Sequence, residues 1–172
     1  MLILIDGYNL IKQSDNLRRY ERKSLEAGRN ALITKLVEYE KKKSHRIIVV
    51  FDGRKSGSPD EGRDREGRIN IIYSRYGERA DDVIKRLAAQ AVGDIIVVSS
   101  DREISSYATS LGKTPLTSPE FEMIMNKVIY SSPERIKPAQ KVEINERQKK
   151  KKGPAKRQPR AKRRTQVKIK KL

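Results

Sequence analysis

Three short apolar runs in the first 130 residues alternate with longer segments of helical pattern, and this alternation constrains the fold most. The runs at 1–5, 47–51 and 95–98 are too short for helices and apolar throughout, which is typical of strands buried on both faces. A fourth strand is predicted at 69–73. Strands separated by helices are joined by right-handed crossovers and form a mostly parallel sheet. The sequence therefore predicts an α/β fold with helices on both faces of the sheet.

Helices are predicted where apolar residues recur at helical spacing next to residues that favour helix ends. Asp81 or Asp82 suits the start of one helix, and Gly112 suits the end of another. The segment 54–68 is dense in Gly and charge and is predicted to be an exposed loop. The predicted helices span 24–40, from Asp81 or Asp82 to about 92, 104–111 and 118–128.

The charge of the chain is unevenly distributed. Of the 172 residues, 35% are apolar and 36% are charged, and the net charge is +18. Positions 133–172 hold 17 Lys or Arg against 3 Asp or Glu, with few large apolar residues to bury. Such a segment cannot offset its ordering entropy by burial. We expect one globular domain at 1–130 and a basic, disordered tail at 131–172.

Several classes of protein are excluded by composition. The chain has no cysteine, which excludes disulfides and thiolate-ligated metal clusters and fits a cytoplasmic location. The N-terminus has neither the basic nor the apolar segment of a secretory signal. No run approaches 18 apolar residues, so neither a transmembrane helix nor a membrane partner is expected.

Aspartates follow three of the predicted strands. Asp6, Asp52 and Asp101 each come at or just after a strand end, and Asp81-Asp82 stands at a helix start. The carboxyl ends of parallel strands share one edge of the sheet, so these carboxylates are expected to converge. Like charges held close together repel, and a hard divalent cation such as Mg²⁺ or Mn²⁺ is the usual compensation. Alone, each aspartate reads as a helix cap or turn residue; their recurrence at one edge favours a metal site.

Polar residues near these aspartates have open roles. Asn9 can orient Asp6, touch a substrate phosphate or cap a helix. Ser99 and Ser100 can bond metal-bound water or cap the next helix. His45 is the only histidine and lies in a polar run. It is expected to be solvated, which argues against catalysis centred on imidazole.

Five motifs in order resemble one family. They are Asp6-Gly7-Tyr8-Asn9, Val50-Phe51-Asp52-Gly53, Tyr73-Ser74-Arg75, Ala80-Asp81-Asp82-Val83-Ile84 and Ser99-Ser100-Asp101. Over about residues 1–130, the set resembles the YacP-like branch of the NYN domains, within the PIN-like nuclease superfamily. The resemblance implies a PIN-like three-layer α/β/α sandwich and metal-dependent ribonuclease activity. It also implies a further strand near 113–116, which Pro115 would keep short or at an edge.

The same resemblance assigns roles to the acidic residues. Asp6, Asp81 and Asp101 match the principal acidic positions, Asp52 and Asp82 match auxiliary ones, and Asn9 matches the asparagine of the motif. One or two Mg²⁺ or Mn²⁺ ions would lower the pKa of a bound water and polarise the scissile phosphate. The expected activity is endonucleolytic cleavage of single-stranded RNA.

Basic and aromatic residues are candidates for RNA binding. The basic tail is the stronger signal, because clustered cations bind phosphates without sequence preference. It can tether the domain to messenger or ribosomal RNA, or to the ribosome. Tyr73 and Tyr76 can stack on unpaired bases, although Tyr73 fits the core equally well. The candidate cations are Arg54, Lys55, Arg75, Arg79, Lys85 and Arg102 near the site, and Lys150, Lys151, Arg163 and Arg164 in the tail.

Two other readings compete with a nuclease. A non-catalytic RNA-binding module of PIN-like fold is one, but it would have no need to keep Asp6, Asp81 and Asp101 together. A phospho-receiver or an aspartyl phosphatase is the other. The receiver's paired acids after the first strand are not evident, and the phosphatase would need an aspartate where Tyr8 stands. The pattern is compatible with a monomer or an oligomer.

Overall fold

The computed structural model describes residues 1–53, 61–131, 167–169 and 171–172. Strands and helices alternate along the chain as the sequence predicts. In order, the elements are β1 (Leu2–Asp6), α1 (Gly7–Gln13), α2 (Asp15–Glu21), α3 (Leu25–Lys43), β2 (Arg46–Phe51), β3 (Gly62–Glu66), β4 (Ile69–Tyr73), α4 (Ala80–Gln90), β5 (Ile95–Val98), α5 (Arg102–Ser110), β6 (Thr114–Leu116) and α6 (Ser118–Tyr130).

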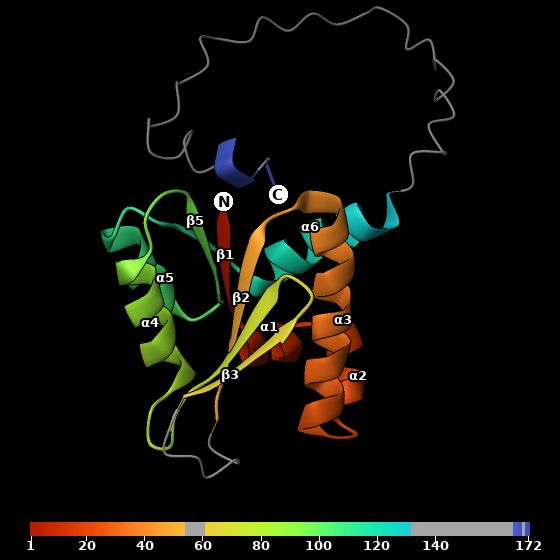
Figure 1. Cartoon of the computed structure of the whole chain (residues 1–172). Coiled ribbons are helices and arrows are strands. Elements are labelled where there is room, and N and C mark those ends of the chain that lie inside the picture. Colours follow the sequence, from red (N-terminus) through yellow and green to blue (C-terminus); the bar gives the residue numbers. More distant parts are fainter. Residues whose placement is uncertain (54–60, 132–166, 170) are drawn as a thin grey trace, which may run out of the picture.

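The strands form one six-stranded sheet in the order β3-β4-β2-β1-β5-β6. All neighbouring strands are parallel except β3, which runs antiparallel to β4. Helices α4 and α5 cover one face of the sheet, and α1, α2, α3 and α6 lie on the other (Figure 1). The predicted three-layer α/β/α arrangement with a mostly parallel sheet is confirmed.

Alternate residues of each central strand point into two separate cores. In β1, Ile3 and Ile5 pack with α1, α3 and α6, whereas Leu4 packs with α4 and α5. The same alternation in β5 sends Ile96 to the first core and Val97 to the second. Both faces of the central strands are therefore dry, which explains why their sequences are continuous apolar runs.

Three elements differ from the sequence prediction. The expected loop at 54–68 contains strand β3, whose polar side chains are mostly exposed because it pairs only with β4 at the edge of the sheet. Helices α1 and α2 were not predicted. Each has only seven residues, and Ser14 separates them by ending α1 and capping α2, its hydroxyl accepting the Leu17 N–H.

The predicted helices and the short sixth strand are present with shifted ends. Helix α4 begins at Ala80, so neither Asp81 nor Asp82 is its cap residue. Arg79 stands in that position, and the Asp82 carboxylate accepts the Arg79 backbone N–H at 3.4 Å. Strand β6 is a three-residue edge strand containing Pro115, as expected.

The last residues of the chain pack against the domain. Leu172 is only 3% exposed and belongs to the core between the sheet and α3. The Tyr39 hydroxyl donates to the Leu172 carbonyl at 3.2 Å, and Lys168 pairs with Asp94 at 2.9 Å. These residues, which the sequence analysis assigns to the tail, therefore contact the domain in the structure. The disorder predicted for 132–166 and 170 lies outside the described residues.

The described residues contain no helix that is long and apolar enough to span a membrane.

Candidate active site

Four aspartates lie at the carboxyl edge of the sheet. Asp6 ends β1, Asp52 follows β2, and Asp101 is the cap residue between β5 and α5. Asp81 lies in the first turn of α4. Their charges interact: both Asp81 and Asp52 raise the pKa of Asp6, and Asp101 raises that of Asp81. The parallel strands thus bring these carboxylates to one edge, as the sequence predicts.

Asp6 is the most buried of these carboxylates, with 7% exposure. Its Oδ1 accepts the Asn9 backbone N–H and its Oδ2 accepts the Ser99 hydroxyl, both at 3.1 Å. These bonds favour the charged form, but burial outweighs them and raises the pKa of Asp6 to about 6. The fold therefore holds the Asp6 side chain in a position where its charged form is unfavourable.

Ser99 joins two of the aspartates. Its hydroxyl donates to Asp6 and accepts the Asp101 backbone N–H at 3.1 Å. Asp101 in turn caps α5, since its Oδ1 accepts the N–H groups of Glu103 at 2.7 Å and Ile104 at 3.3 Å. Ser99 was predicted either to bond metal-bound water or to cap the next helix, and the residue that caps this helix is Asp101. Ser99 fixes the separation of Asp6 and Asp101.

Asn9 connects three elements through its side-chain oxygen. That oxygen accepts the Ser100 backbone N–H at 2.9 Å and the Ser118 hydroxyl at 2.8 Å. The side chain therefore ties α1 to the end of β5 and the start of α6, and only the backbone of Asn9 orients Asp6. Ser118 is the first residue of α6, and the cap position before it is held by Thr117. No sequence motif signals the bond between Ser118 and Asn9.

The remaining aspartates are held by α4. Asp52 Oδ1 accepts the Ala80 N–H at 3.0 Å, which fixes the start of α4 to the end of β2. Asp81 lies 2.5 Å from the Arg79 guanidinium. Burial is the largest influence on the pKa of Asp81 and raises it, whereas Arg79 lowers it. Asp82 is exposed and bonds the Arg79 backbone.

The donor set suits a hard cation in kind, because these side chains offer only oxygen. Within the described residues, however, no group of three or more His, Cys, Asp or Glu side chains is gathered closely enough to hold a metal ion. The arrangement fits an ion held by few carboxylates that retains several waters, which is the usual mode for Mg²⁺.

Three of the predicted phosphate-binding cations are already paired. Arg75 lies 3.2 Å from Glu78, Arg79 pairs with Asp81, and Lys85 pairs with Glu103. Arg102 is exposed. The other predicted cations, Arg54, Lys55, Lys150, Lys151, Arg163 and Arg164, lie outside the described residues.

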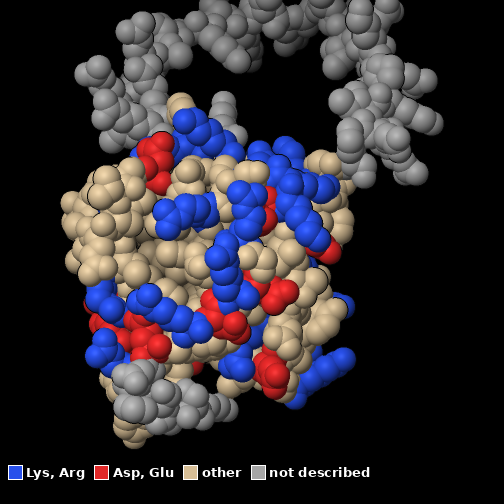
Figure 2. Space-filling model, viewed as in Figure 1, with Lys and Arg blue, Asp and Glu red and all other residues tan. Residues whose placement is uncertain are grey.

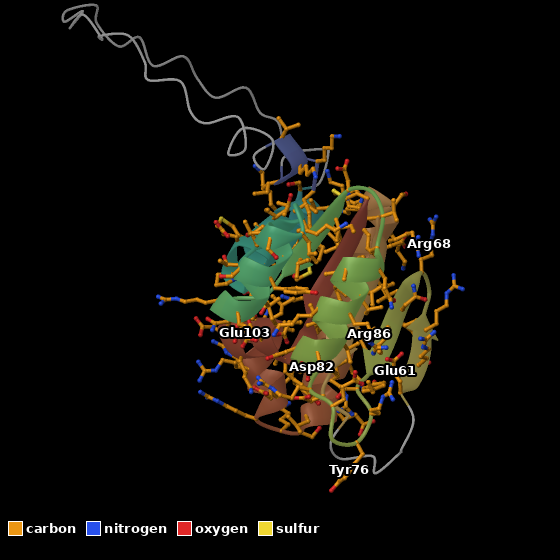
Figure 3. The ribbon with its side chains drawn as sticks, turned by 90° about the vertical axis from the view of Figure 1, so that its left-hand side faces the viewer. Glu61, Arg68, Tyr76, Asp82, Arg86 and Glu103 are labelled. Carbon is orange, nitrogen blue, oxygen red and sulfur yellow. The ribbon has the colours of Figure 1, made fainter. Side chains whose placement is uncertain are left out.

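The surface beside α4 is mixed in sign. In the lower part of the face in Figure 2, Lys and Arg lie side by side with Asp and Glu. Arg86, which the sequence reading overlooked, lies beside Glu61 at 2.6 Å (Figure 3). Tyr76 points away from the domain and is 72% exposed, whereas Tyr73 is half-buried against the core. This face has no clean basic patch among the described residues.

A three-layer α/β/α sandwich with carboxylates at the carboxyl edge of its sheet is the arrangement of a nuclease-like α/β domain. The model of the YacP-like NYN domain family matches residues 3–171, and the chain belongs to that family. NYN domains are nuclease-like domains that act on RNA. The match runs well past residue 130, where the resemblance was expected to end.

Known relatives agree with this assignment. The uncharacterized protein YacP of Bacillus subtilis (strain 168) is 34% identical over 94 residues, covering 55% of this chain and 54% of that protein. The match thus spans about half the length of that relative. A crystal structure of Rae1 (YacP) from Bacillus subtilis, in a single-residue variant, gives a TM-score of 0.63 at 27% identity, covering 74% of this chain and 76% of that one. Another Rae1 (YacP) structure gives 0.60 at 26% identity, covering 74% and 75%.

Proposed function

We propose that the protein is a metal-dependent endoribonuclease that cleaves single-stranded RNA by attack of water on the phosphodiester. The observation that carries this proposal is the buried carboxylate of Asp6 at the carboxyl edge of the sheet. Burial is the main cause that raises its pKa to about 6, and the charges of Asp81 and Asp52 add to it. A buried carboxylate beside other carboxylates destabilises the folded protein unless a bound cation compensates for the negative charge.

The cofactor proposed is Mg²⁺ or Mn²⁺. Asp6, Asp81 and Asp101 are its proposed ligands. Because no three acidic side chains of the described residues are gathered around one point, one or two of them would contact the ion directly and the rest would act through its waters. Asp52 and Asp82 would add negative charge nearby. When bound, a divalent cation lowers the pKa of a water and neutralises charge on the phosphate. The protein's part is orientation. Ser99 bonds both Asp6 and Asp101 and so fixes their relative positions. Asp52 bonds the first residue of α4, the helix that carries Asp81.

The basic segment at 132–166, the part of the predicted tail that lies outside the described residues, is proposed to tether RNA. Its clustered cations suit messenger or ribosomal RNA, and through the latter the ribosome, with an affinity that falls steeply with salt. The absence of cysteine fits a cytoplasmic site of action. Tethering raises the local concentration of RNA without requiring further contacts at the acidic edge.

The test is cleavage of an unstructured RNA by the full chain with Mn²⁺, with Mg²⁺ and with EDTA. We expect metal-dependent cleavage that falls at least about 100-fold in Asp6→Asn and Asp101→Asn, since loss of even an outer-shell partner of a metal site costs about 10- to 100-fold. Glu38→Gln, an exposed change on α3, is the matched control and should cleave normally. Equal cleavage by all four proteins would contradict the site.

A second candidate is a non-catalytic RNA-binding module. It is favoured by one observation: in the described part of the chain no three acidic side chains are gathered around a common point. Binding of RNA without cleavage under either metal would support this alternative. Isothermal titration with Mn²⁺ separates the two, because the module has no need of the metal.

A further inference from the structure

An aromatic cluster lies at the same edge of the sheet as the aspartates. Phe51 ends β2 and Tyr73 ends β4, and their rings stack with centroids 5.9 Å apart. Tyr8, in α1, meets Phe51 edge to face with centroids 5.1 Å apart. Of the three rings only Phe51 is fully buried; Tyr8 and Tyr73 keep part of their surface accessible.

Arg29 of α3 joins the two tyrosines. Its Nη1 donates to the Tyr8 hydroxyl at 2.8 Å, and its guanidinium carbon lies 5.6 Å from the centre of the Tyr73 ring. Within the described residues, no carboxylate lies at ion-pairing distance from Arg29, whereas Arg75, Arg79 and Lys85 are all paired. Arg29 therefore has both charge and further N–H groups to offer a ligand.

The backbone fixes Tyr8 close to Asp6. A β-carbon at Gly7 would lie 2.2 Å from the Phe51 ring, so only glycine lets the chain pass this ring between Asp6 and Tyr8. Because strand side chains alternate, Asp6 lies on the α4 side of the sheet and the Phe51 ring on the α3 side. A strand of RNA crossing this edge would meet carboxylates on one side and aromatic rings on the other.

We propose that Tyr8, Tyr73 and Arg29 form a subsite that binds an unpaired nucleobase next to the phosphate held at the acidic edge. The inference rests on the proposed function, of which it defines the substrate contact. The rings supply a stacking surface that any base can use, and packing against Phe51 orders them before RNA arrives. Arg29 adds hydrogen-bond donors for a base edge. The subsite selects single strands, because a paired base is stacked within its own helix.

The test compares two ligands of equal charge in EDTA, so that nothing is cleaved. One is a ten-nucleotide single-stranded RNA, and the other has the same backbone with the central bases removed. Fluorescence anisotropy should show that the wild-type chain binds the complete RNA about tenfold more tightly or better, the size expected for one stacked base. The contribution of the basic segment cancels in this ratio, since both ligands carry the same phosphates.

Variants locate the preference. Tyr8→Leu and Arg29→Gln should bring the two affinities to within about twofold of each other, and Tyr8→Phe should keep most of the difference. Tyr130→Leu, at the exposed end of α6, is the matched control and should keep all of it. An unfolded fraction would bind both ligands through its cations and lower the ratio, so circular dichroism first checks that each variant is folded. If Tyr8→Leu does not fold, Arg29→Gln decides.

The outcomes separate this inference from the proposed function. Equal wild-type affinities for the two ligands, or a preference that survives Tyr8→Leu and Arg29→Gln, would overturn the subsite even if the protein cleaves RNA. The other case is a protein that cleaves no RNA under Mn²⁺ or Mg²⁺ but prefers the complete RNA, with a preference that these variants lose. That result would support the subsite and contradict the nuclease.

Discussion

At the scale of single residues, Asp6 is in conflict with its surroundings. Its carboxylate is nearly buried and repelled by Asp81 and Asp52, and two hydrogen bonds only partly offset this. A side chain held so is unfavourable for folding at neutral pH. Its presence is understandable if a ligand of positive charge relieves the cost when it binds.

The pKa of Asp6 predicts how stability depends on pH. It rises from 3.8 to about 6 on folding, so between these values the folded protein binds a proton that the unfolded chain has lost. The free energy of unfolding should therefore fall as pH rises from about 4 to 6, by on the order of 2–3 kcal/mol. Asp6→Asn lacks this titration, and without metal it should be more stable than wild type by a similar amount at pH 7.5.

Urea unfolding in EDTA at several pH values measures this difference. The two proteins should converge near pH 4, where Asp6 is protonated in the folded state. A stability difference that stays constant from pH 4 to 7.5 would show that the titration of Asp6 is not its cause. Added Mn²⁺ should stabilise the wild type more than Asp6→Asn.

The sequence could place the aspartates but not their partners. Strand ends in a parallel sheet predict where Asp6, Asp52 and Asp101 lie, because that requires only the fold class. The bond from Ser99 to Asp6 and the packing of Tyr8 on Phe51 depend on side-chain rotamers across elements distant in the chain. No local pattern carries that information.

At the scale of elements, Asn9 joins three structures at the acidic edge. It belongs to α1, and its side-chain oxygen accepts from Ser100 after β5 and from Ser118 at the start of α6. Ser118 is fully buried, so its hydroxyl cannot form a hydrogen bond with solvent water if this acceptor is lost. One amide thus links α1 to the end of β5 and the start of α6.

Replacement of Asn9 tests that link. Asn9→Ala leaves two donors without their acceptor and should lower the free energy of unfolding by about 1–3 kcal/mol. Asn9→Asp keeps the acceptor oxygen and should lose less of the two bonds. Asn16→Ala, exposed in α2, is the control and should change stability by less than about 0.5 kcal/mol. Chemical unfolding of the three variants measures this; equal losses for Asn9→Ala and Asn16→Ala would refute the role.

Elements were predictable where burial shapes the sequence. The central strands are apolar on both faces and α4 is amphipathic, so their patterns are strong. Strand β3 buries almost nothing and is stabilised by pairing with β4, which leaves no apolar pattern to detect. Helices α1 and α2 are too short for periodicity to show, and a single serine divides them.

At the scale of the whole molecule, the two ends of the parallel strands differ, and we call them the carboxyl edge and the amino edge of the sheet. The aspartates occupy the carboxyl edge. The end of the chain packs at the amino edge, where Lys168 meets Asp94 just before β5 and the Lys171 carbonyl lies 3.3 Å from His45 just before β2. Both termini lie at this edge (Figure 1). The described residues on either side of 132–166 thus lie at the amino edge, away from the aspartates.

The contact of the last residues with the domain could not be predicted from the sequence, because these residues lie in a basic run. Ile169 and Leu172 stand among lysines, where isolated apolar residues resemble the rest of a solvated tail. They pack against core residues around Tyr39 that only the assembled domain brings together. The match of the family model up to residue 171 agrees with a chain end that is part of the domain.

Leu172→Ala measures how much this anchoring contributes. Leu172 is nearly buried in the core, so truncating it should cost about 2–5 kcal/mol of folding stability, toward the lower end if the chain end detaches instead of leaving a cavity. Val167→Ala, at a position 56% exposed, is the matched control and should be nearly neutral. Thermal unfolding compares them. A Leu172→Ala protein as stable as Val167→Ala would show that the chain end is not held in the core, and the basic segment would then be anchored at α6 alone.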